Sequence, residues 1–225
     1  ISGLPRLNII RKFFWKIVVK KIDIITTPTE ATKNYLKEVL KKKEIYLLRD
    51  PIIFVKEIIK KQKKLKNHKP YKNLYVSIGR LTKQKNFIFL LKFFSKIIKD
   101  NKDIKLAIIG VGEEKNQINN YIKTNNLEDN IILLGYQNNV YKYLKNSKAF
   151  ILSSLWEDPG FVLIEAMATN CLVLSSDCSN GPKEIINNKN GLLFKNKDEN
   201  DLLDKLTLLI EDDNLRDNLK KHGYE

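Results

Sequence analysis

Beyond residue 72, the hydrophobic and polar positions alternate between two kinds of segment. Short, continuous apolar runs are separated by longer stretches whose apolar positions recur at helical spacing. The apolar runs are 74–79, 104–110, 130–135, 148–154 and 171–176, and the helical stretches are 87–99, 115–126, 140–147 and 161–170. Continuous apolar runs are typical of strands that are buried on both faces. We therefore predict an α/β fold with a Rossmann-like, doubly wound parallel sheet over residues 73–225.

The opening part of the chain follows another pattern. Residues 7–21 place large apolar side chains at helical spacing with basic residues between and after them, which predicts a basic amphipathic helix. This helix could pack its apolar stripe on a neighbouring element or lie against a membrane surface, and both interpretations stay open. Short strands are expected within 23–29 and 44–54. Between them we expect a helix that Thr29 caps.

The charge of the chain is concentrated near its beginning. Its 225 residues carry 41 basic and 26 acidic side chains, a net charge of +15, and 43% of them are hydrophobic, which excludes wholesale disorder. Residues 1–70 hold 19 of the basic and 6 of the acidic side chains. This asymmetry allows nucleic acid or an anionic membrane as a partner. The aromatic residues Phe13, Phe14 and Trp15 are clustered rather than interleaved with basic ones, which disfavours nucleic acid.

Residues 57–72 form a lysine-rich segment with a proline near its end, and we interpret it as a linker or a solvated helix that joins two units. No window of the sequence approaches the length of an apolar membrane span. The first residue is Ile1 rather than Met and no signal peptide follows it, so we expect a cytoplasmic fragment of a longer protein. With only Cys171 and Cys178, we expect reduced thiols rather than a disulfide framework.

Two common cofactor motifs are weak in this sequence. Gly110 and Gly112 resemble the start of a dinucleotide-binding fingerprint, but Lys115 occupies the position of the third glycine. His68 and His222 have no ligand-spaced cysteines or carboxylates around them, which makes a zinc site improbable. We expect neither a metal nor a nicotinamide cofactor.

Polar residues follow the first of the predicted strands of this sheet. Gly79 and Arg80 come directly after it, and Lys85 stands a few residues later. Arginine is unexpected here, because the chain has only five among its 41 basic residues. A guanidinium group offers a planar fork that fits phosphate oxygens, and lysine adds a point charge. Taken alone, the two cations are better explained as ordinary exposed surface residues.

The densest cluster follows the predicted strand 148–154. Glu157 and Glu165 are eight residues apart, and Pro159 and Gly160 stand where a loop should turn into a helix whose first amides can bind an anion. Glu165 lies within an apolar run, where a carboxylate needs a hydrogen-bonding partner. Sugar hydroxyls or an internal salt bridge would both satisfy it.

A further loop-to-helix turn follows the predicted strand 171–176. Pro182 suits the first turn of a helix, which makes Gly181 the expected cap. The resulting amides would face the same edge of the sheet as the two clusters above.

Together these segments resemble the carboxyl-terminal domain of retaining GT-B glycosyltransferases of family GT4, the glycosyl transferases group 1. The resemblance rests on Gly79-Arg80-Leu81 followed by Lys85, on the two glutamates with seven residues between them, and on residues 179–194. It implies that residues 73–225 are a nucleotide-sugar-binding domain, 57–72 a linker and 1–56 the tail of an amino-terminal acceptor domain.

The resemblance also implies roles for individual residues. Arg80 and Lys85, beside Gly79, would hold the donor diphosphate, and Glu157 would contact the donor sugar. Glu165 would bind the ribose hydroxyls. The remaining donor contacts are the backbone amides around Gly160, Phe161 and Val162 for the phosphates, and Tyr136 and Gln137 for the nucleobase. The sequence departs from the family motif at Asp158-Pro159, where Gly-Phe is common, and at Asn86, where Gly is frequent. Asp158 places an extra negative charge near the expected sugar pocket.

By this resemblance, the expected activity is retaining transfer of a hexosyl unit from a nucleotide sugar, UDP-linked, to a lipid-linked or polysaccharide acceptor. It would serve biosynthesis of lipopolysaccharide, capsule or exopolysaccharide, without a metal, at the cytoplasmic face of an anionic membrane. Two alternatives stay open. One is a noncatalytic nucleotide-sugar-binding subunit, or an inactive fragment, that needs a separate acceptor-domain partner. The other is a basic membrane-surface protein with a degenerate site.

Overall fold

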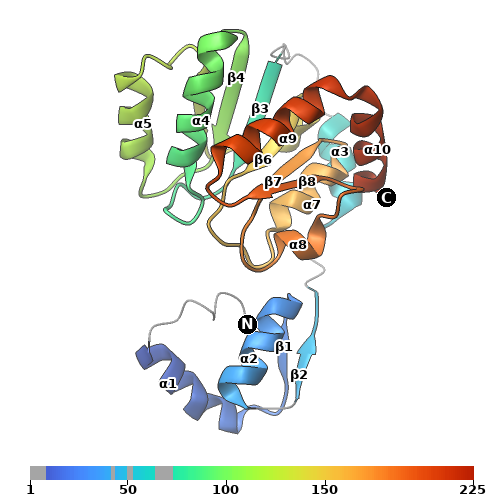
Figure 1. The fold of residues 1–225 in the computed structure, drawn as a ribbon. Coiled ribbons are helices and arrows are strands. Elements are labelled where there is room, and N and C mark those ends of the chain that lie inside the picture. Colours follow the sequence, from blue (N-terminus) through green and yellow to red (C-terminus); the bar gives the residue numbers. More distant parts are fainter. Residues whose placement is uncertain (1–8, 42–43, 50–52, 64–72) are drawn as a thin grey trace.

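The computed structural model describes residues 9–41, 44–49, 53–63 and 73–225, which form a small amino-terminal unit and a larger unit (Figure 1). The small unit comprises α1 (Ile9–Val18), the 3-10 helix η2 (Val19–Lys21), β1 (Ile25–Thr27), α2 (Glu30–Leu40) and β2 (Ile45–Leu47). β1 and β2 pair in parallel, and Ile25 lies opposite Ile45. The predicted cap is confirmed, because Thr29 accepts a hydrogen bond from the N–H of Thr32 at the start of α2.

The larger unit is built on a six-stranded, wholly parallel sheet, which confirms the predicted fold class. Its strands are β3 (Asn73–Ile78), β4 (Ile104–Ile109), β5 (Ile131–Gly135), β6 (Ala149–Leu152), β7 (Val173–Asp177) and β8 (Leu192–Lys195). They are ordered β5-β4-β3-β6-β7-β8. The chain therefore adds β4 and β5 on one side of β3 and then, from β6 onward, adds strands on the other side. In doubly wound sheets, ligands bind outside the carboxyl ends of the two strands at this switch point.

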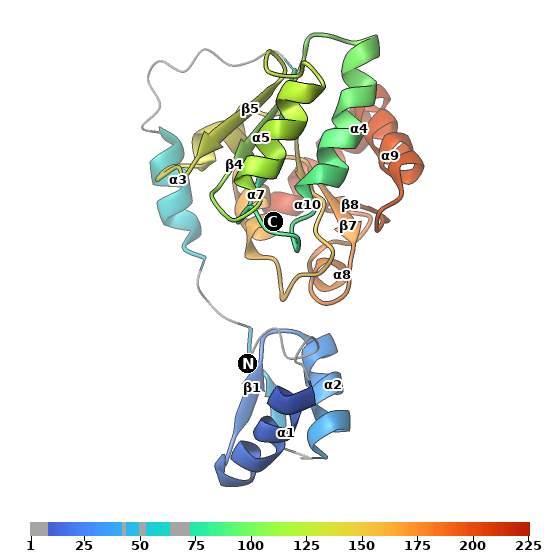
Figure 2. The ribbon, with the colours of Figure 1, turned by 90° about the vertical axis from the view of Figure 1, so that its left-hand side faces the viewer.

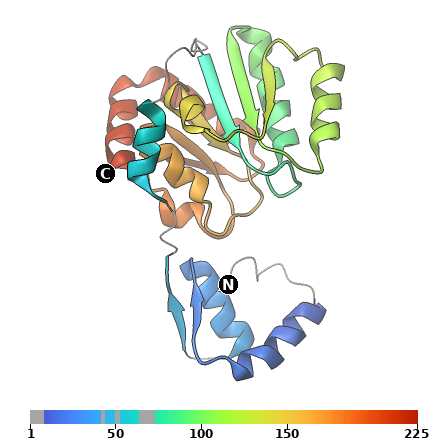
Figure 3. The same ribbon diagram turned by 180° about the vertical axis from the view of Figure 1, so that it is seen from behind.

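Helices cover both faces of the sheet. They are α3 (Val55–Lys63), α4 (Phe87–Asp100), α5 (Lys115–Thr124), α6 (Tyr141–Lys145), α7 (Phe161–Ala168), α8 (Pro182–Ile185), α9 (Glu199–Glu211) and α10 (Asp213–Tyr224). Along β3, Tyr75 joins the apolar core under α4, α5 and α9, while Leu74 and Val76 join the core under α6 and α7 (Figures 2 and 3). This alternation follows from the two-residue period of a strand. It explains the continuous apolar runs, because consecutive residues of a strand point to opposite faces and both faces are buried.

The segment expected as a linker is partly a packed helix. Residues 57–63 belong to α3, which contacts α6 and α7 and buries Ile58 almost completely. The side chain of Gln62 donates a hydrogen bond to the carbonyl of Ala168 in α7. Lysines surround a narrow apolar face, so the composition concealed this packing. Residues 64–72 lie outside the described residues, and the domain boundaries stay a prediction.

The predicted amphipathic helix is α1 followed by η2, and residues 7 and 8 lie outside the described part of the chain. Val19 is buried in the small core with Ile25, Leu36 and Ile45, and Trp15 of α1 packs against this core. The other large apolar residues of α1 face solvent. These are Ile9, Ile10, Phe13, Phe14 and Ile17, each at least 50% exposed. Among the described helices, none combines the length and the apolar character that a bilayer crossing requires.

Candidate functional site

A cavity of about 430 Å³ lies at the carboxyl ends of β3 and β6, where the sheet topology predicts a ligand site. It brings together residues from the turn after β3, the loop after β6 and the first turns of α7. Its lining comprises Ile78, Gly79, Arg80, Gln84, Lys85, Trp156, Glu157, Asp158, Gly160, Phe161, Val162 and Glu165. The two clusters that the sequence analysis singled out after separate strands therefore meet in one place.

The turn that carries Arg80 is positioned by close contact with the turn after β4. The N–H of Gly79 donates to the carbonyl of Ile109, 3.0 Å away. Gly110 has a φ of 146°, and a Cβ at this position would lie 1.9 Å from the carbonyl oxygen of Gly79. Only glycine fits such an approach. The glycine pair that resembled a dinucleotide fingerprint thus serves packing between neighbouring strand ends.

Lys85 and Glu157 form an ion pair between the Nζ and Oε1 atoms. Both side chains are largely buried, with exposed fractions of 13% and 6%. The hydroxyl of Ser154 donates to the same carboxylate oxygen. A carboxylate this buried requires such partners, because an unpaired charge in the interior is costly. The residue predicted to bind the diphosphate and the residue predicted to bind the sugar are therefore in direct contact.

The first turn of α7 opens on the same cavity. Gly160 is the N-cap residue with a φ of 95° and provides no side-chain cap, as expected for a loop-to-helix turn of this composition. The N–H groups of Phe161 and Val162 have no acceptor within the helix at its start. Together with the positive end of the helix dipole, such amides favour an anion.

Glu165 lines the cavity from the second turn of α7 and is held by a residue that the sequence analysis missed. The Tyr141 hydroxyl donates to its Oε1 atom over 3.1 Å. Burial raises the pKa of Glu165, and the hydrogen bond from Tyr141 and the charge of Lys61 lower it only in part. The pKa of Tyr141 is raised to about 12, mainly by burial and next by the charge of Glu165. The partner is thus a phenol rather than the salt bridge considered from the sequence.

Two predicted donor contacts lie outside the lining of this cavity. Tyr136, in the loop after β5, is 74% exposed. The side chain of Gln137 donates to the carbonyl of Leu134 and accepts a hydrogen bond from the Tyr143 hydroxyl. Its amide therefore stabilises the loop itself. Contact of either residue with a base stays a prediction.

Sequence reasoning also missed how the loop after β6 is attached. The side chain of Gln84 donates to the carbonyl of Trp156 over 2.8 Å, and its own backbone carbonyl accepts from the N–H of Leu155. Asp158 is engaged by the small unit, because the Thr29 and Thr32 hydroxyls donate to its carboxylate. The extra charge expected beside the sugar pocket is therefore hydrogen-bonded.

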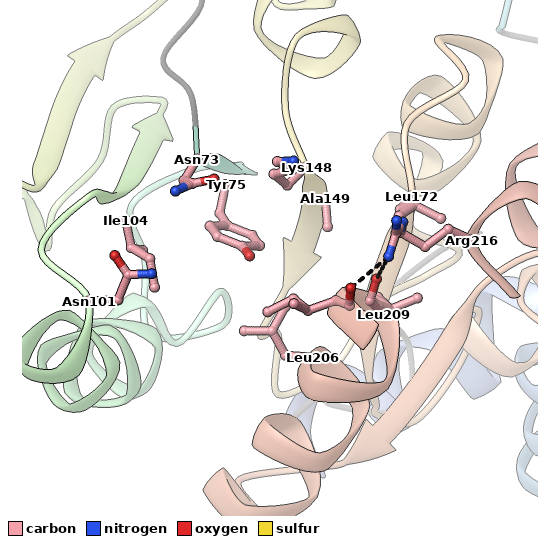
Figure 4. A pocket seen from close by; sticks show the side chains of 11 residues that line it. Asn73, Tyr75, Asn101, Ile104, Lys148, Ala149, Leu172, Leu206, Leu209 and Arg216 are labelled. Carbon is pink, nitrogen blue, oxygen red and sulfur yellow. Dashed lines mark hydrogen bonds between the residues drawn. The ribbon is translucent and has the colours of Figure 1, made fainter. Parts of the chain in front are cut away.

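A second, smaller cavity of about 180 Å³ lies at the opposite edge of the sheet, near the amino ends of the strands (Figure 4). Tyr75 and Leu206 face each other in it. Arg216 lines it as well, but its guanidinium donates to the carbonyls of Leu209 and Ile210 at the end of α9. The residues around this cavity include no carboxylate and none of the predicted site residues.

Within the described residues, no three His, Cys, Asp or Glu side chains are grouped as a metal site requires. Cys171 and Cys178 are both buried and unbonded to each other. Burial raises the pKa of each thiol to about 11. Neither thiol is activated as a nucleophile.

The model of the family "Glycosyl transferases group 1" matches residues 56–225. An uncharacterized glycosyltransferase of Methanocaldococcus jannaschii is 36% identical over 181 residues, which cover 76% of this chain and 44% of that protein. A second relative, from Campylobacter jejuni, is 37% identical over 142 residues, 63% of this chain and 38% of its own length. Its name is N-acetylgalactosamine-N,N'-diacetylbacillosaminyl-diphospho-undecaprenol 4-alpha-N-acetylgalactosaminyltransferase.

Among solved structures, a mutant of S. aureus TarM in complex with fondaparinux, alpha-GlcNAc-glycerol and UDP superimposes with a TM-score of 0.80 at 25% identity. The match covers 95% of this chain and 42% of TarM. The chain thus spans less than half the length of these three proteins.

Proposed function

The chain belongs to the glycosyl transferases group 1 family, and on this basis we propose that its cavity between β3 and β6 binds a UDP-linked sugar as the donor. The donor's hexosyl group passes to a lipid-linked or polysaccharide acceptor with retention of configuration. The pathway proposed is biosynthesis of a cell-surface glycan such as lipopolysaccharide, capsule or exopolysaccharide.

The observation that carries this proposal is the meeting of cations, helix amides and carboxylates at the switch point of the sheet. Arg80, Lys85 and the first amides of α7 line one cavity with Glu157 and Glu165. Charge builds up on the diphosphate as the glycosidic bond breaks. Groups that are already oriented toward this charge stabilise the transition state without reorganisation. The proposal assigns that stabilisation to the two cations and the helix amides, without a metal.

The carboxylates take separate roles in this proposal. Glu157 contacts the donor sugar and is held in place by Lys85 and Ser154, while Glu165 accepts hydrogen bonds from the ribose hydroxyls. Retaining hydrolases use two carboxylates about 5 Å apart, one of which attacks the sugar. Because Glu165 is assigned to the ribose, we favour a front-face reaction in which the leaving phosphate guides the acceptor. A covalent glycosyl intermediate trapped by Glu157→Gln would contradict this mechanism.

The proposed acceptor is supported by the name of one relative and by the surface of α1. The Campylobacter jejuni relative's name describes a diphospho-undecaprenol-linked acceptor. In this chain, α1 exposes Phe13 and Phe14 and carries Lys16, and Lys20 follows in η2, a combination that suits the surface of an anionic membrane. We propose peripheral contact with the cytoplasmic face. Vesicles of phosphatidylglycerol should bind the chain more strongly than phosphatidylcholine vesicles, and Phe13→Ser with Phe14→Ser should weaken that binding.

A donor screen tests the function. The full-length gene product is incubated with UDP-, GDP- and ADP-linked hexoses, and release of the nucleotide is measured with and without undecaprenyl-diphosphate-linked glycan acceptors. Acceptor-dependent release from a UDP sugar, lost in Arg80→Ala, is the expected result. UDP binding without turnover would favour the noncatalytic subunit. Absence of both binding and turnover would reject the donor site.

A further inference from the structure

Asp158 connects the proposed donor cavity to the small amino-terminal unit. It lines the cavity directly after Glu157 in the chain. Its Oδ1 atom accepts from the Thr29 hydroxyl at 3.0 Å, and both of its carboxylate oxygens lie 3.2 Å from the Thr32 hydroxyl. Thr29 and Thr32 are completely buried. Two hydroxyls of the small unit thus donate hydrogen bonds to the carboxylate of Asp158, which lines the cavity.

A second carboxylate of the larger unit holds the same end of α2. The two side-chain oxygens of Glu184, in α8, accept hydrogen bonds from the N–H groups of Glu30 and Ala31, at 3.0 and 3.1 Å. These are the first two residues of α2, whose N–H groups have no partner within the helix. The carboxylate also suits the positive end of the helix dipole. Arg49 Nη2 lies 3.8 Å from Glu184.

Asp158, in the loop after β6, and Glu184, in α8 after β7, therefore both accept hydrogen bonds from the amino end of α2. In Figure 1, α8 lies on the side of the larger unit that faces the small unit. The loop that carries Asp158 and the turn before α8 are also in contact, because a Cβ on Gly181 would lie 2.0 Å from the carbonyl oxygen of Pro159. Movement of α2 would be transmitted to both.

We infer that Asp158 is a positioning residue and that, with Glu184, it forms a dock for the amino end of α2 that controls donor affinity. With α2 docked, the Asp158 charge is engaged by hydroxyls and the adjacent Glu157 keeps its place. With α2 displaced, Asp158 loses the two hydroxyl donors that share its charge, and the carboxylate repels the diphosphate more strongly. This inference rests on the proposed function and deepens it, because it adds a contact between the units that regulates the same site.

The test uses the full 225-residue chain with UDP as the probe, measured by calorimetry. Thr32→Val removes the hydroxyl that contacts both oxygens of Asp158 at nearly constant volume, while the Thr29 cap stays. We expect UDP affinity to fall about tenfold. Thr32→Ser restores the hydroxyl and should bind UDP within about twofold of the unchanged chain. Asn34→Ala, an exposed position of the same helix, is the matched control.

Asp158→Asn separates positioning from general damage. Without the charge, Thr32→Val should have no further effect on UDP affinity. Glu184→Gln should speed hydrogen exchange at the amides of Glu30 and Ala31 and also weaken UDP binding. If Thr32→Val leaves UDP affinity within about twofold, or lowers it equally in the Asp158→Asn background, the dock is refuted while the donor site stands. If the unchanged chain does not bind UDP, the donor proposal itself fails.

Discussion

Lys85, in the turn after β3, forms a largely buried ion pair with Glu157, in the loop after β6. The pair spans the switch point of the sheet and ties together the two segments that carry most of the candidate site. A contact of this kind is important for stability whenever only one of its charges is removed, because the other is then left buried and unpaired.

Lys85→Ala should therefore lower the free energy of unfolding by about 3–5 kcal/mol. The double variant Lys85→Met with Glu157→Gln should recover much of that loss, since no buried charge remains. Urea unfolding followed by circular dichroism measures both. Lys83→Ala, at an exposed position of the same turn, should change stability by less than about 0.5 kcal/mol. Equal stability of Lys85→Ala and Lys83→Ala would show that the pair does not form.

Stability should depend on pH through Glu165. Burial raises its pKa above the value of 4.5 that an exposed glutamate has, so folding favours the protonated form. The stabilisation that protonated Glu165 contributes is fully present below pH 4.5, the pKa in the unfolded state. It is lost as the pH rises through the raised pKa of the folded state. Glu165→Gln cannot ionise and should be more stable than the unchanged chain at about pH 8, with the difference vanishing near about pH 4. Urea unfolding at several pH values provides the comparison.

Tyr141→Phe sharpens the same experiment. The hydrogen bond from Tyr141 lowers the pKa of Glu165, so its removal should move the pH range of the stability loss upward. Glu38→Gln, at an exposed position of α2, should show none of this behaviour. An advantage of Glu165→Gln at about pH 4 that disappears at about pH 8 would contradict the assigned direction.

Gly110 should tolerate no side chain. A Cβ would meet the carbonyl oxygen of Gly79 at 1.9 Å, and the φ of 146° is strained for any other residue. Gly110→Ala should cost about 2–5 kcal/mol of stability and displace the turn that carries Arg80. Gly135 is the matched control, because it has a φ of 64° and a Cβ added there would meet no atom within 4 Å. Gly135→Ala should cost only about 1–2 kcal/mol, and an equal cost for both would refute the packing role.

The thiols of Cys171 and Cys178 should react slowly in the folded protein. Both are buried, and burial raises their pKa to about 11, so few thiolates are present at neutral pH. Titration with Ellman's reagent at about pH 8 should modify neither within minutes, and both after denaturation in guanidinium chloride. Rapid modification of a thiol in the folded chain would contradict the burial of that residue.

Most of the sheet could be predicted because its strands are buried on both faces. Such strands read as continuous apolar runs, and the residues after them meet at one edge whatever the loop details. Arg80, Lys85, Glu157 and Glu165 were accessible to sequence reasoning for this reason. The apolar face of α3 could not be predicted, because lysines surround Ile58 and their composition is typical of a solvated segment.

The partners of the site residues could not be predicted. Tyr141 reaches Glu165 from a different helix, and Thr32 reaches Asp158 across 126 positions of the sequence. Such contacts depend on how whole elements pack, so no local sequence pattern predicts them. Asp158 reads as an unexplained extra charge in the sequence, whereas the fold gives it two hydroxyl partners.

The most direct test of the donor site is calorimetric titration with UDP of the unchanged chain and of Arg80→Ala and Glu165→Ala. Arg80 offers a fork to phosphate and Glu165 accepts from ribose, and a charge-assisted hydrogen bond contributes about 1.5–3 kcal/mol. Each variant should therefore bind UDP at least about tenfold more weakly, while Lys99→Ala on α4 binds normally. Equal, negligible heats for the unchanged chain and both variants would contradict the donor site.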